Sequence, residues 1–199
     1  IEDNLNAWEK SDRRKKFQEI LFKQDKVDPN EVIYSKDRAM AKGMTSTLCF
    51  PIGNLAPEGA VIKSTAIDSS VVDTDGVYRL TGPAKVFSTE KDAVRAVKGL
   101  GNKIIEKGDV IILYGRGPIG AGMEEVAQVA LALKHLDWGK HVALLTDARF
   151  SGVSSGACIG HISPEALANG PIGKIRDGDF IRIEIDREKL CGSINFIGC

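Results

Sequence analysis

Two glycine-rich segments near the middle of the chain constrain its fold more than any other feature. They read GRGPIGAGMEE at residues 115–125 and TDARFSGVSSGACIGH at residues 146–161. Each follows a short apolar run, VIILY at residues 110–114 and HVALLT at residues 141–146, typical of buried strands. If these strands are neighbours, both turns meet at one rim with flexible backbone, an acidic pair and a serine cluster. Such a rim indicates an active site rather than a purely structural domain.

The size and charge of the chain exclude several classes of partner. Its 199 residues are 43% hydrophobic, enough for one large domain or a domain with an appendage. The 27 basic residues balance the 27 acidic ones, and no basic stripe or tail suggests nucleic acid or an anionic membrane. The apolar runs are far shorter than the about 20 residues of a membrane-spanning helix. The sequence begins with Ile1 and shows no signal segment, so we expect a piece of a longer protein.

The cysteines and histidines form no recognisable metal motif. Four widely spaced cysteines include no CxxC pair, and three histidines include no HxxxH or HExxH spacing. A chain with its own core does not need disulfides, so we expect reduced thiols in a cytoplasmic protein. The residues concerned are Cys49, Cys158, Cys191, Cys199, His135, His141 and His161.

Residues 1–42 are expected to form a helical linker or appendage. Apolar residues recur at near-helical spacing over residues 1–24, and the run DRRKK supplies a solvated face. Pro29 then favours a turn. From residue 43 the composition shifts to Thr, Ser, Gly and β-branched residues, so the main domain is expected over residues 43–199. The apolar positions of the helix are Leu5, Trp8, Phe17, Ile20 and Leu21.

The main domain is expected to combine many short strands with two or three helices. This pattern favours a β-rich α/β barrel or a layered sheet over a regular βαβ array. The predicted elements are strand–loop–strand over residues 46–68, two short strands around a Gly82–Pro83 turn, a helix capped by Thr89 and Asp92, a helix from Gly122 to His135, a half-exposed strand within residues 176–186, and a last strand at CGSINF.

The first glycine turn contains a literal dinucleotide-binding motif. Gly115, Gly117 and Gly120 match GxGxxG between a predicted strand and a predicted helix. The glycines of that motif let backbone N–H groups approach a pyrophosphate at a helix N-terminus. Two features count against it: Glu124 and Glu125 are expected in the first helical turn, where they would repel a pyrophosphate, and the next strand-end acid comes too late.

The second turn contains a literal serine-hydrolase motif. Gly152, Ser154 and Gly156 match GxSxG, in which the serine lies on a sharp turn directly after a strand. Here the run DARFSG separates the strand from Ser154. The only later histidine, His161, precedes Glu165, whereas the motif requires the acid before the histidine.

A third interpretation is acid–base chemistry on a polyhydroxy acid. A glutamate beside a glycine-rich helix start can bind Mg²⁺, which prefers carboxylate oxygens. A serine held among backbone N–H donors and near a metal can ionise enough to act as a base. The residue patterns alone leave these three interpretations open.

The longer motifs resemble one family. Residues 53–68, residues 115–125 and residues 146–186 are similar to the dihydroxy-acid and sugar-acid dehydratases, and the resemblance covers about residues 43–198. The wording GRGP followed by GMEE, and ALKHL before the second strand, is most similar to the D-xylonate dehydratase branch. The segments WEKSDRRKK and DPNEVIYS also resemble that branch.

The resemblance implies a fold and a set of partners. The fold is an α/β, β-barrel-like swivelling (β/β/α) domain with flanking helices, preceded by an N-terminal helical linker. The family's separate N-terminal domain, which nothing in this chain matches, would hold an iron–sulfur cluster (2Fe–2S or 4Fe–4S) and further Mg²⁺ ligands. The chain would then be inactive alone, have its own N-terminal domain and a small sugar acid as partners, and belong to a homo-oligomer.

The implied reaction removes water from a 2,3-dihydroxy acid such as D-xylonate and gives a 2-keto-3-deoxy acid. In the family, Mg²⁺ binds the carboxylate and 2-hydroxyl, the cluster iron acts as a Lewis acid on the 3-hydroxyl, and a serine alkoxide takes the C2 proton. One alternative is the dihydroxy-acid dehydratase of branched-chain amino-acid synthesis. An alternative of another class is a non-catalytic binding or assembly module that docks through its first helix.

The resemblance also assigns the metal ligand and the base. The family's GPGMxE glutamate falls on Glu125, which is therefore the expected Mg²⁺ ligand. This chain has Ala121 in place of the proline and an extra acid, Glu124, so the roles of Glu124 and Glu125 could be exchanged. The serine of the family's GRFSG falls on Ser151, the expected base; its alternative role is to cap the loop.

The remaining site residues are expected to bind substrate or to cover the site. Arg149 and Ser154 are assigned to substrate binding, with a structural ion pair as the alternative for Arg149. Asn54 and Lys63 lie in a loop that is expected to close over the site. The four cysteines are expected not to be cluster ligands.

Overall fold

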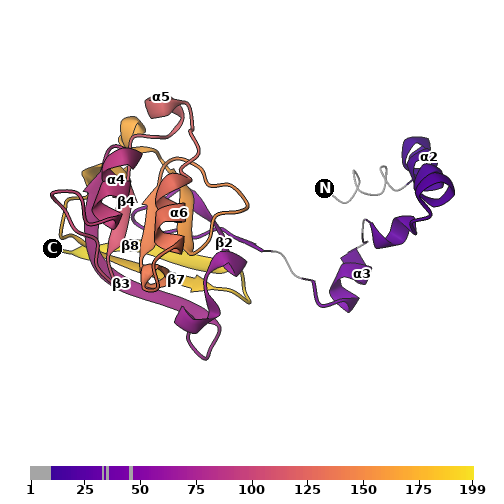
Figure 1. Ribbon diagram of the computed structural model, residues 1–199, viewed down its shortest axis with the longest axis horizontal. Helices are drawn as coiled ribbons and strands as arrows, with labels where there is room; N and C mark the ends of the chain where they lie inside the picture. The colour runs from indigo at the N-terminus through magenta and orange to yellow at the C-terminus, as the bar shows by residue number, and fades with distance from the viewer. Residues whose placement is uncertain (1–9, 33, 35, 45–46) are drawn as a thin grey trace. The chain divides into compact units, whose positions relative to one another are not determined.

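The computed structural model describes residues 10–32, 34, 36–44 and 47–199. They fall into two compact units, Ile1–Ser46 and Thr47–Cys199, each described below by itself (Figure 1). Within the described ranges, no helix is long and apolar enough to cross a membrane. The expected domain division, 1–42 and 43–199, stays a prediction.

The first unit is helical. Its elements are α2 (Asp12–Ile20), the π-helical turn η1 (Leu21–Asp25), the 3-10 turn η2 (Pro29–Glu31) and α3 (Lys36–Ala41). The Ser11 hydroxyl caps α2 by accepting a hydrogen bond of 3.2 Å from the Arg14 N–H. No residue of α2 is buried, so its apolar side chains, including Phe17, face solvent within this unit. The predicted positions Leu5 and Trp8 lie outside the described residues.

The second unit is built on one eight-stranded sheet with the order β1-β2-β6-β5-β4-β3-β7-β8. The four strands β3 to β6 are parallel to their neighbours among themselves, and the outer pairings are antiparallel. The strands are β1 (Leu48–Cys49), β2 (Gly59–Lys63), β3 (Val77–Phe87), β4 (Val110–Leu113), β5 (Ala143–Thr146), β6 (Ala157–Ser163), β7 (Phe180–Asp186) and β8 (Cys191–Gly198).

The sheet curls until its two edges almost meet. The segment after β1 reaches β8, where Ile52 pairs with Ser193 in an isolated bridge. The Leu55 N–H adds a hydrogen bond of 3.3 Å to the Ile194 carbonyl. The result is a nearly closed barrel-like sheet, and it confirms the predicted β-rich α/β barrel.

The strand β3 corrects one prediction. We expected two short strands around a Gly82–Pro83 turn, but β3 runs unbroken through both residues. It pairs with β7 up to Pro83 and with β4 from Ala84 onward. A Cβ atom on Gly82 would lie 1.8 Å from the Gly108 carbonyl oxygen. The glycine therefore permits a close backbone approach where the strand changes partners, rather than a reversal of the chain.

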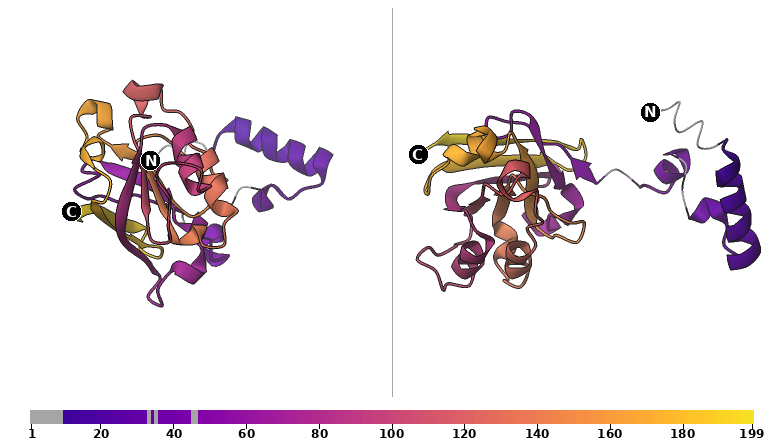
Figure 2. Two further views of the ribbon diagram at one scale, coloured as in Figure 1. Left: turned by 60° about the vertical axis from the view of Figure 1, so that its left-hand side comes forward. Right: turned by 90° about the horizontal axis from the view of Figure 1, so that it is seen from above.

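Both faces of the parallel strands are buried. In β4, Val110 and Ile112 point into the barrel core, and Ile111 and Leu113 pack under the helices α4 (Glu90–Val97) and α6 (Gln128–Lys134). Figure 2 shows these helices outside the curled sheet, on the side of the barrel opposite β7 and β8. Burial on two faces explains why β4 and β5 read as continuous apolar runs.

One predicted helix is confirmed and another is wrong. Thr89 caps α4 as predicted, since its hydroxyl accepts from the Asp92 N–H at 3.2 Å. The predicted helix from Gly122 is wrong: a short α5 (Pro118–Ala121) ends at Gly122, which has φ +69°, and α6 begins only at Gln128. The other short 3-10 turns are η3 (Ser64–Ala66), η4 (Ser69–Val71), η5 (Gly139–His141), η6 (Ala166–Ala168) and η7 (Pro171–Lys174).

Replacing Gly82 should destabilise the barrel. Gly82→Ala places a methyl group against the fixed Gly108 carbonyl, so the free energy of unfolding should fall by about 1–3 kcal/mol or more. The matched control is Gly152→Ala, because nothing lies within 4 Å of a Cβ at that position. Its effect should stay within about 0.5 kcal/mol. Urea unfolding followed by circular dichroism measures both, and equal midpoints would refute the close-approach argument.

Candidate functional site

The parallel pairing of β4 and β5 brings the two glycine-rich segments together. Leu113 pairs with Thr146, so both strands end at one rim, as predicted. The second segment then leaves this rim. Ala157 to His161, predicted as part of the turn, begin β6, which runs parallel to β5 and starts beside Ala143. Residues 147–156 must therefore cross back along the sheet from one end to the other.

A buried carboxylate joins the segments at the rim. Asp147 is 1% exposed. Its oxygens accept hydrogen bonds from the backbone N–H groups of Gly115 at 2.9 Å, Arg116 at 2.9 Å and Ala166 at 3.0 Å. Bonds of this kind to a charged acceptor are among the strong ones in proteins. Asp147 thereby fixes the first glycine turn to the end of β5 and to the chain after β6.

A second carboxylate holds the next residues of the same turn. Glu165, 8% exposed, accepts from the Ile119 N–H at 2.8 Å and from the Gly120 N–H at 3.4 Å. A Cβ on Gly117 would lie 2.4 Å from Glu165 Oε2. The glycine is thus required by the packing of this carboxylate against the turn.

These contacts decide against a dinucleotide site. The N–H groups that would approach a pyrophosphate in a GxGxxG turn are engaged by the protein's own carboxylates. The sequence had predicted a different obstacle to pyrophosphate binding, namely two glutamates in the first helical turn, and this prediction is wrong. Glu124 and Glu125 lie in an irregular segment before α6, and not in a first helical turn.

The two adjacent glutamates have different surroundings. The Arg116 guanidinium forms a two-pronged ion pair with Glu124, with its Nη2 atom 2.5 Å from Oε2. The pKa of Arg116 is raised because of this hydrogen bond. Glu125 is exposed, and its carboxylate has no hydrogen bond or ion pair with any residue in the described ranges. Glu125 is therefore the acid that is available to an outside ligand.

Arg149 fixes the segment that carries these glutamates. Its backbone pairs with Glu125 in an isolated parallel bridge, and its N–H donates to the Glu124 carbonyl at 3.2 Å. Its side-chain Nε donates to the Met123 carbonyl at 2.9 Å. The guanidinium thus bonds to backbone rather than to an acid through this atom. The pairing places Glu125 beside Arg149, which precedes Ser151 by two residues.

Ser151 lies in a small cavity beside β2 and β6. Its hydroxyl oxygen is buried and has no hydrogen-bond partner in the described part of the chain. The cavity has a volume of about 130 Å³, and its lining includes Ser154, Lys63 and His161. Lys63 spans it by donating to the Gly152 carbonyl at 2.7 Å. Since buried hydroxyls are nearly always paired, this one is a candidate for contact with a ligand.

Tyr78 also has a buried hydroxyl without a partner among the described residues, but its surroundings differ from those of Ser151. Its side chain belongs to the barrel core. Burial raises the pKa of Tyr78, so the phenol stays neutral. Ser151 differs because a cavity with a cationic side chain adjoins it.

The serine-hydrolase arrangement lacks its acid. Glu165 is engaged by the backbone N–H groups of α5, and the His161 side chain forms no hydrogen bond with any residue in the described ranges. Asn54 lies away from the cavity: its side-chain amide exchanges hydrogen bonds with the Phe196 backbone and helps to close the barrel. Of the two loop residues expected near the site, only Lys63 is there.

The cysteines do not fit an iron–sulfur cluster. All four are unpaired, and the described residues contain no group of three or more potential metal-binding side chains. Burial raises the pKa of Cys49 to about 11 and that of Cys158 to about 12, which keeps both thiols protonated. Glu125 fits a hard cation such as Mg²⁺ as one carboxylate ligand among others.

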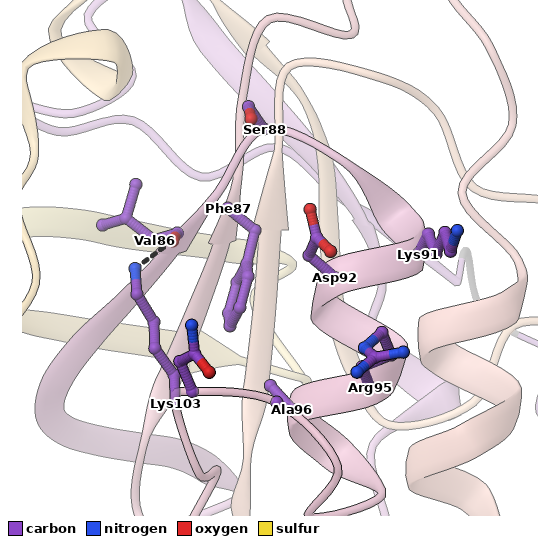
Figure 3. Close-up of a pocket in the computed structure, with 10 residues that line it drawn as sticks. Val86, Phe87, Ser88, Lys91, Asp92, Arg95, Ala96 and Lys103 are labelled. Atoms are coloured by element: carbon purple, nitrogen blue, oxygen red, sulfur yellow. Dashed lines mark hydrogen bonds between the residues drawn. The ribbon is translucent and has the colours of Figure 1, made fainter.

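A larger cavity beside α4 is a weaker candidate, because Lys103 and Arg95 in its lining have partners within the fold. It measures about 550 Å³ and is lined by several cationic side chains, as Figure 3 shows. The Lys103 ammonium donates to the Val86 carbonyl at 2.7 Å and pairs with Asp177 at 2.5 Å. Arg95 donates to the Leu100 carbonyl at 3.1 Å. These charges are satisfied within the fold, so the smaller cavity at Ser151 is the better candidate.

Comparisons with known proteins identify relatives of this chain. The C-terminal family of dihydroxy-acid/6-phosphogluconate dehydratases matches residues 31–195. The chain is 57% identical over 198 residues to D-xylonate dehydratase YagF and 54% identical to D-xylonate dehydratase YjhG, both of Escherichia coli K12. Each alignment covers 100% of this chain and 30% of the relative.

A more distant relative has a different name. The dihydroxy-acid dehydratase of Agathobacter rectalis is 46% identical over 164 residues, which cover 82% of this chain and 27% of the relative. The chain thus spans about a third or less of these relatives. It belongs to the dihydroxy-acid/6-phosphogluconate dehydratase family, of which it represents the C-terminal region.

Proposed function

We propose that this chain is the base-supplying C-terminal part of a hydro-lyase that removes water from a 2,3-dihydroxy sugar acid. D-xylonate is the favoured substrate, and the product is a 2-keto-3-deoxy acid. The names of the two relatives that align with the whole chain support the substrate. The buried, unpaired Ser151 hydroxyl is the observation that carries the chemistry.

Removal of water requires a base at C2, where the proton is only weakly acidic. Ser151 takes this proton, and the enol that forms after loss of the 3-hydroxyl becomes the 2-keto acid. A neutral serine is a weak base, so the alkoxide must be stabilised. The Lys63 ammonium lines the same cavity and favours the charged form of the serine. Ser154, which also lines this cavity, and Arg149 are assigned to substrate binding.

Glu125 is the proposed Mg²⁺ ligand. Its carboxylate is exposed and unengaged by the described residues, whereas Glu124 is held by Arg116. When bound, Mg²⁺ stabilises the negative charge that develops on the substrate as the proton leaves. The described residues supply too few ligands for a complete site, so the others come from the rest of the protein.

The remaining parts of the proposal concern the whole protein. An N-terminal domain beyond this chain holds the iron–sulfur cluster, since the cysteines here do not fit one. The barrel acts as a swivelling domain that closes over that cluster, and the helical unit is the linker. The protein works as a homo-oligomer in the cytoplasm, and this chain alone is inactive.

The other functions have weaker support. The dihydroxy-acid dehydratases align with a smaller share of the chain and at lower identity than the D-xylonate dehydratases do. A non-catalytic module that docks through its first helix gives no role to the Ser151 hydroxyl, which is buried beside Lys63 without a partner among the described residues.

The full-length protein should form 2-keto acid from D-xylonate. The assay uses protein reconstituted without oxygen with iron, sulfide and Mg²⁺, and compares D-xylonate, other aldonates, 6-phosphogluconate and 2,3-dihydroxyisovalerate. A preference for D-xylonate is expected. Preference for dihydroxyisovalerate would move the role to branched-chain amino-acid synthesis, and no keto acid from any substrate, with a verified cluster, would reject the function.

Ser151→Ala should remove the base. In the full-length protein we expect kcat to fall by about 10²- to 10⁴-fold, the usual contribution of a general base. Ser155→Ala is the matched control, a serine in the same crossing segment with no assigned role, and should keep near-normal turnover. Near-normal turnover of Ser151→Ala would show that another group takes the proton.

The two glutamates can be separated by isosteric changes. Glu125→Gln should raise the Mg²⁺ concentration for half-maximal activity by more than about 100-fold, because a ligand is lost. Glu124→Gln breaks only the ion pair with Arg116 and should raise it by about 10-fold or less. Activity is measured over a Mg²⁺ titration of the full-length protein. The opposite ranking would make Glu124 the ligand.

A further inference from the structure

We propose that Asp147 is a positioning residue, which sets the metal ligand Glu125 and the base Ser151 in their places relative to each other. This rests on the function proposed above and adds a residue to it. Asp147 does not touch the substrate in this role. It is almost fully buried, and its hydrogen bonds within the described part of the chain all come from backbone N–H groups.

Asp147 lies between the two segments that carry Glu125 and Ser151. On one side, Asp147 accepts hydrogen bonds from the Gly115 and Arg116 N–H groups of the glycine turn. On the other, the chain that follows Asp147 in sequence crosses the sheet through Arg149 to Ser151. The segment that leads to Glu125 is therefore held at its start by this carboxylate, and the segment that carries Ser151 follows it directly in the sequence.

The contacts around Asp147 form a closed ring. From Asp147 the ring passes to the Arg116 backbone, through the Arg116 guanidinium to Glu124, and from the Glu124 carbonyl to the Arg149 N–H. Arg149 lies two residues after Asp147 and completes it. Glu125 is the next residue after Glu124 and pairs with Arg149. A shift of the glycine turn would thus change the position of Glu125 relative to Ser151.

The positioning role of Asp147 depends on its two acceptor oxygens. Oδ2 receives two N–H groups and Oδ1 receives one. An asparagine has one acceptor oxygen and an amide that would face an N–H donor. Glu165 supports the same turn with one bond of 2.8 Å and one of 3.4 Å. Glutamine at that position keeps the shorter bond and loses only the longer one.

The test compares two buried aspartates in the full-length protein. Asp147→Asn should lower the affinity for Mn²⁺, used in place of Mg²⁺ and followed by its electron paramagnetic resonance signal, by about 10- to 100-fold. Asp109→Asn is the matched control. Asp109 is 4% exposed, accepts from the Glu106 N–H at 2.8 Å and lies at the other end of β4. It should lower thermal stability while leaving Mn²⁺ affinity unchanged.

The outcomes separate this inference from the function. Wild-type Mn²⁺ affinity and turnover in folded Asp147→Asn would overturn the positioning role and leave the function standing. If wild-type protein binds Mn²⁺ but dehydrates no acid, the function fails, and the Mn²⁺ comparison still decides on Asp147. If Asp147→Asn does not fold, Glu165→Gln replaces it, and a smaller loss of Mn²⁺ affinity in the same direction supports the role. Unchanged affinity in Glu165→Gln would overturn it.

Discussion

The parallel pairing of β4, β5 and β6 is the constraint on which the rest of the structure depends. Because parallel strands end at the same rim, the glycine turn after β4 meets Asp147 directly after β5. Because β6 must start where β5 starts, the chain has to cross the sheet between them. That crossing segment carries Ser151. The topology therefore produces both the rim and the serine cavity, and the buried apolar faces of the three strands hold them in place.

The sequence was sufficient for features that depend on local pattern. Continuous apolar runs identified β4 and β5, and strict alternation identified β7. It failed where a distant backbone decides the outcome. Gly82 suggested a turn because nothing in the sequence shows that the Gly108 carbonyl lies against it. The strand β6 was missed because Gly160 and His161 interrupt its apolar pattern.

The candidate site was predictable to a similar degree. The resemblance pointed to Ser151 and Glu125, but it could not show which of two adjacent glutamates is free. That distinction depends on the ion pair of Glu124 with Arg116. Asp147 and Glu165 were not recognised as a pair, since they bind backbone N–H groups and such contacts leave no side-chain motif. The same contacts explain why a literal GxGxxG turn is not a nucleotide site.

The polar groups of the site are of two kinds: some have hydrogen-bond or ion-pair partners among the described residues, and others have none. Asp147, Glu165 and Glu124 are engaged by donors of the chain itself, and they determine where the turns lie. An unpaired buried hydroxyl such as that of Ser151 costs about 1–3 kcal/mol, so the fold gains nothing by keeping it. The cost is explained if a ligand completes the contact. In the proposed function, the groups with partners in the chain define the geometry, and the Ser151 hydroxyl acts on the substrate.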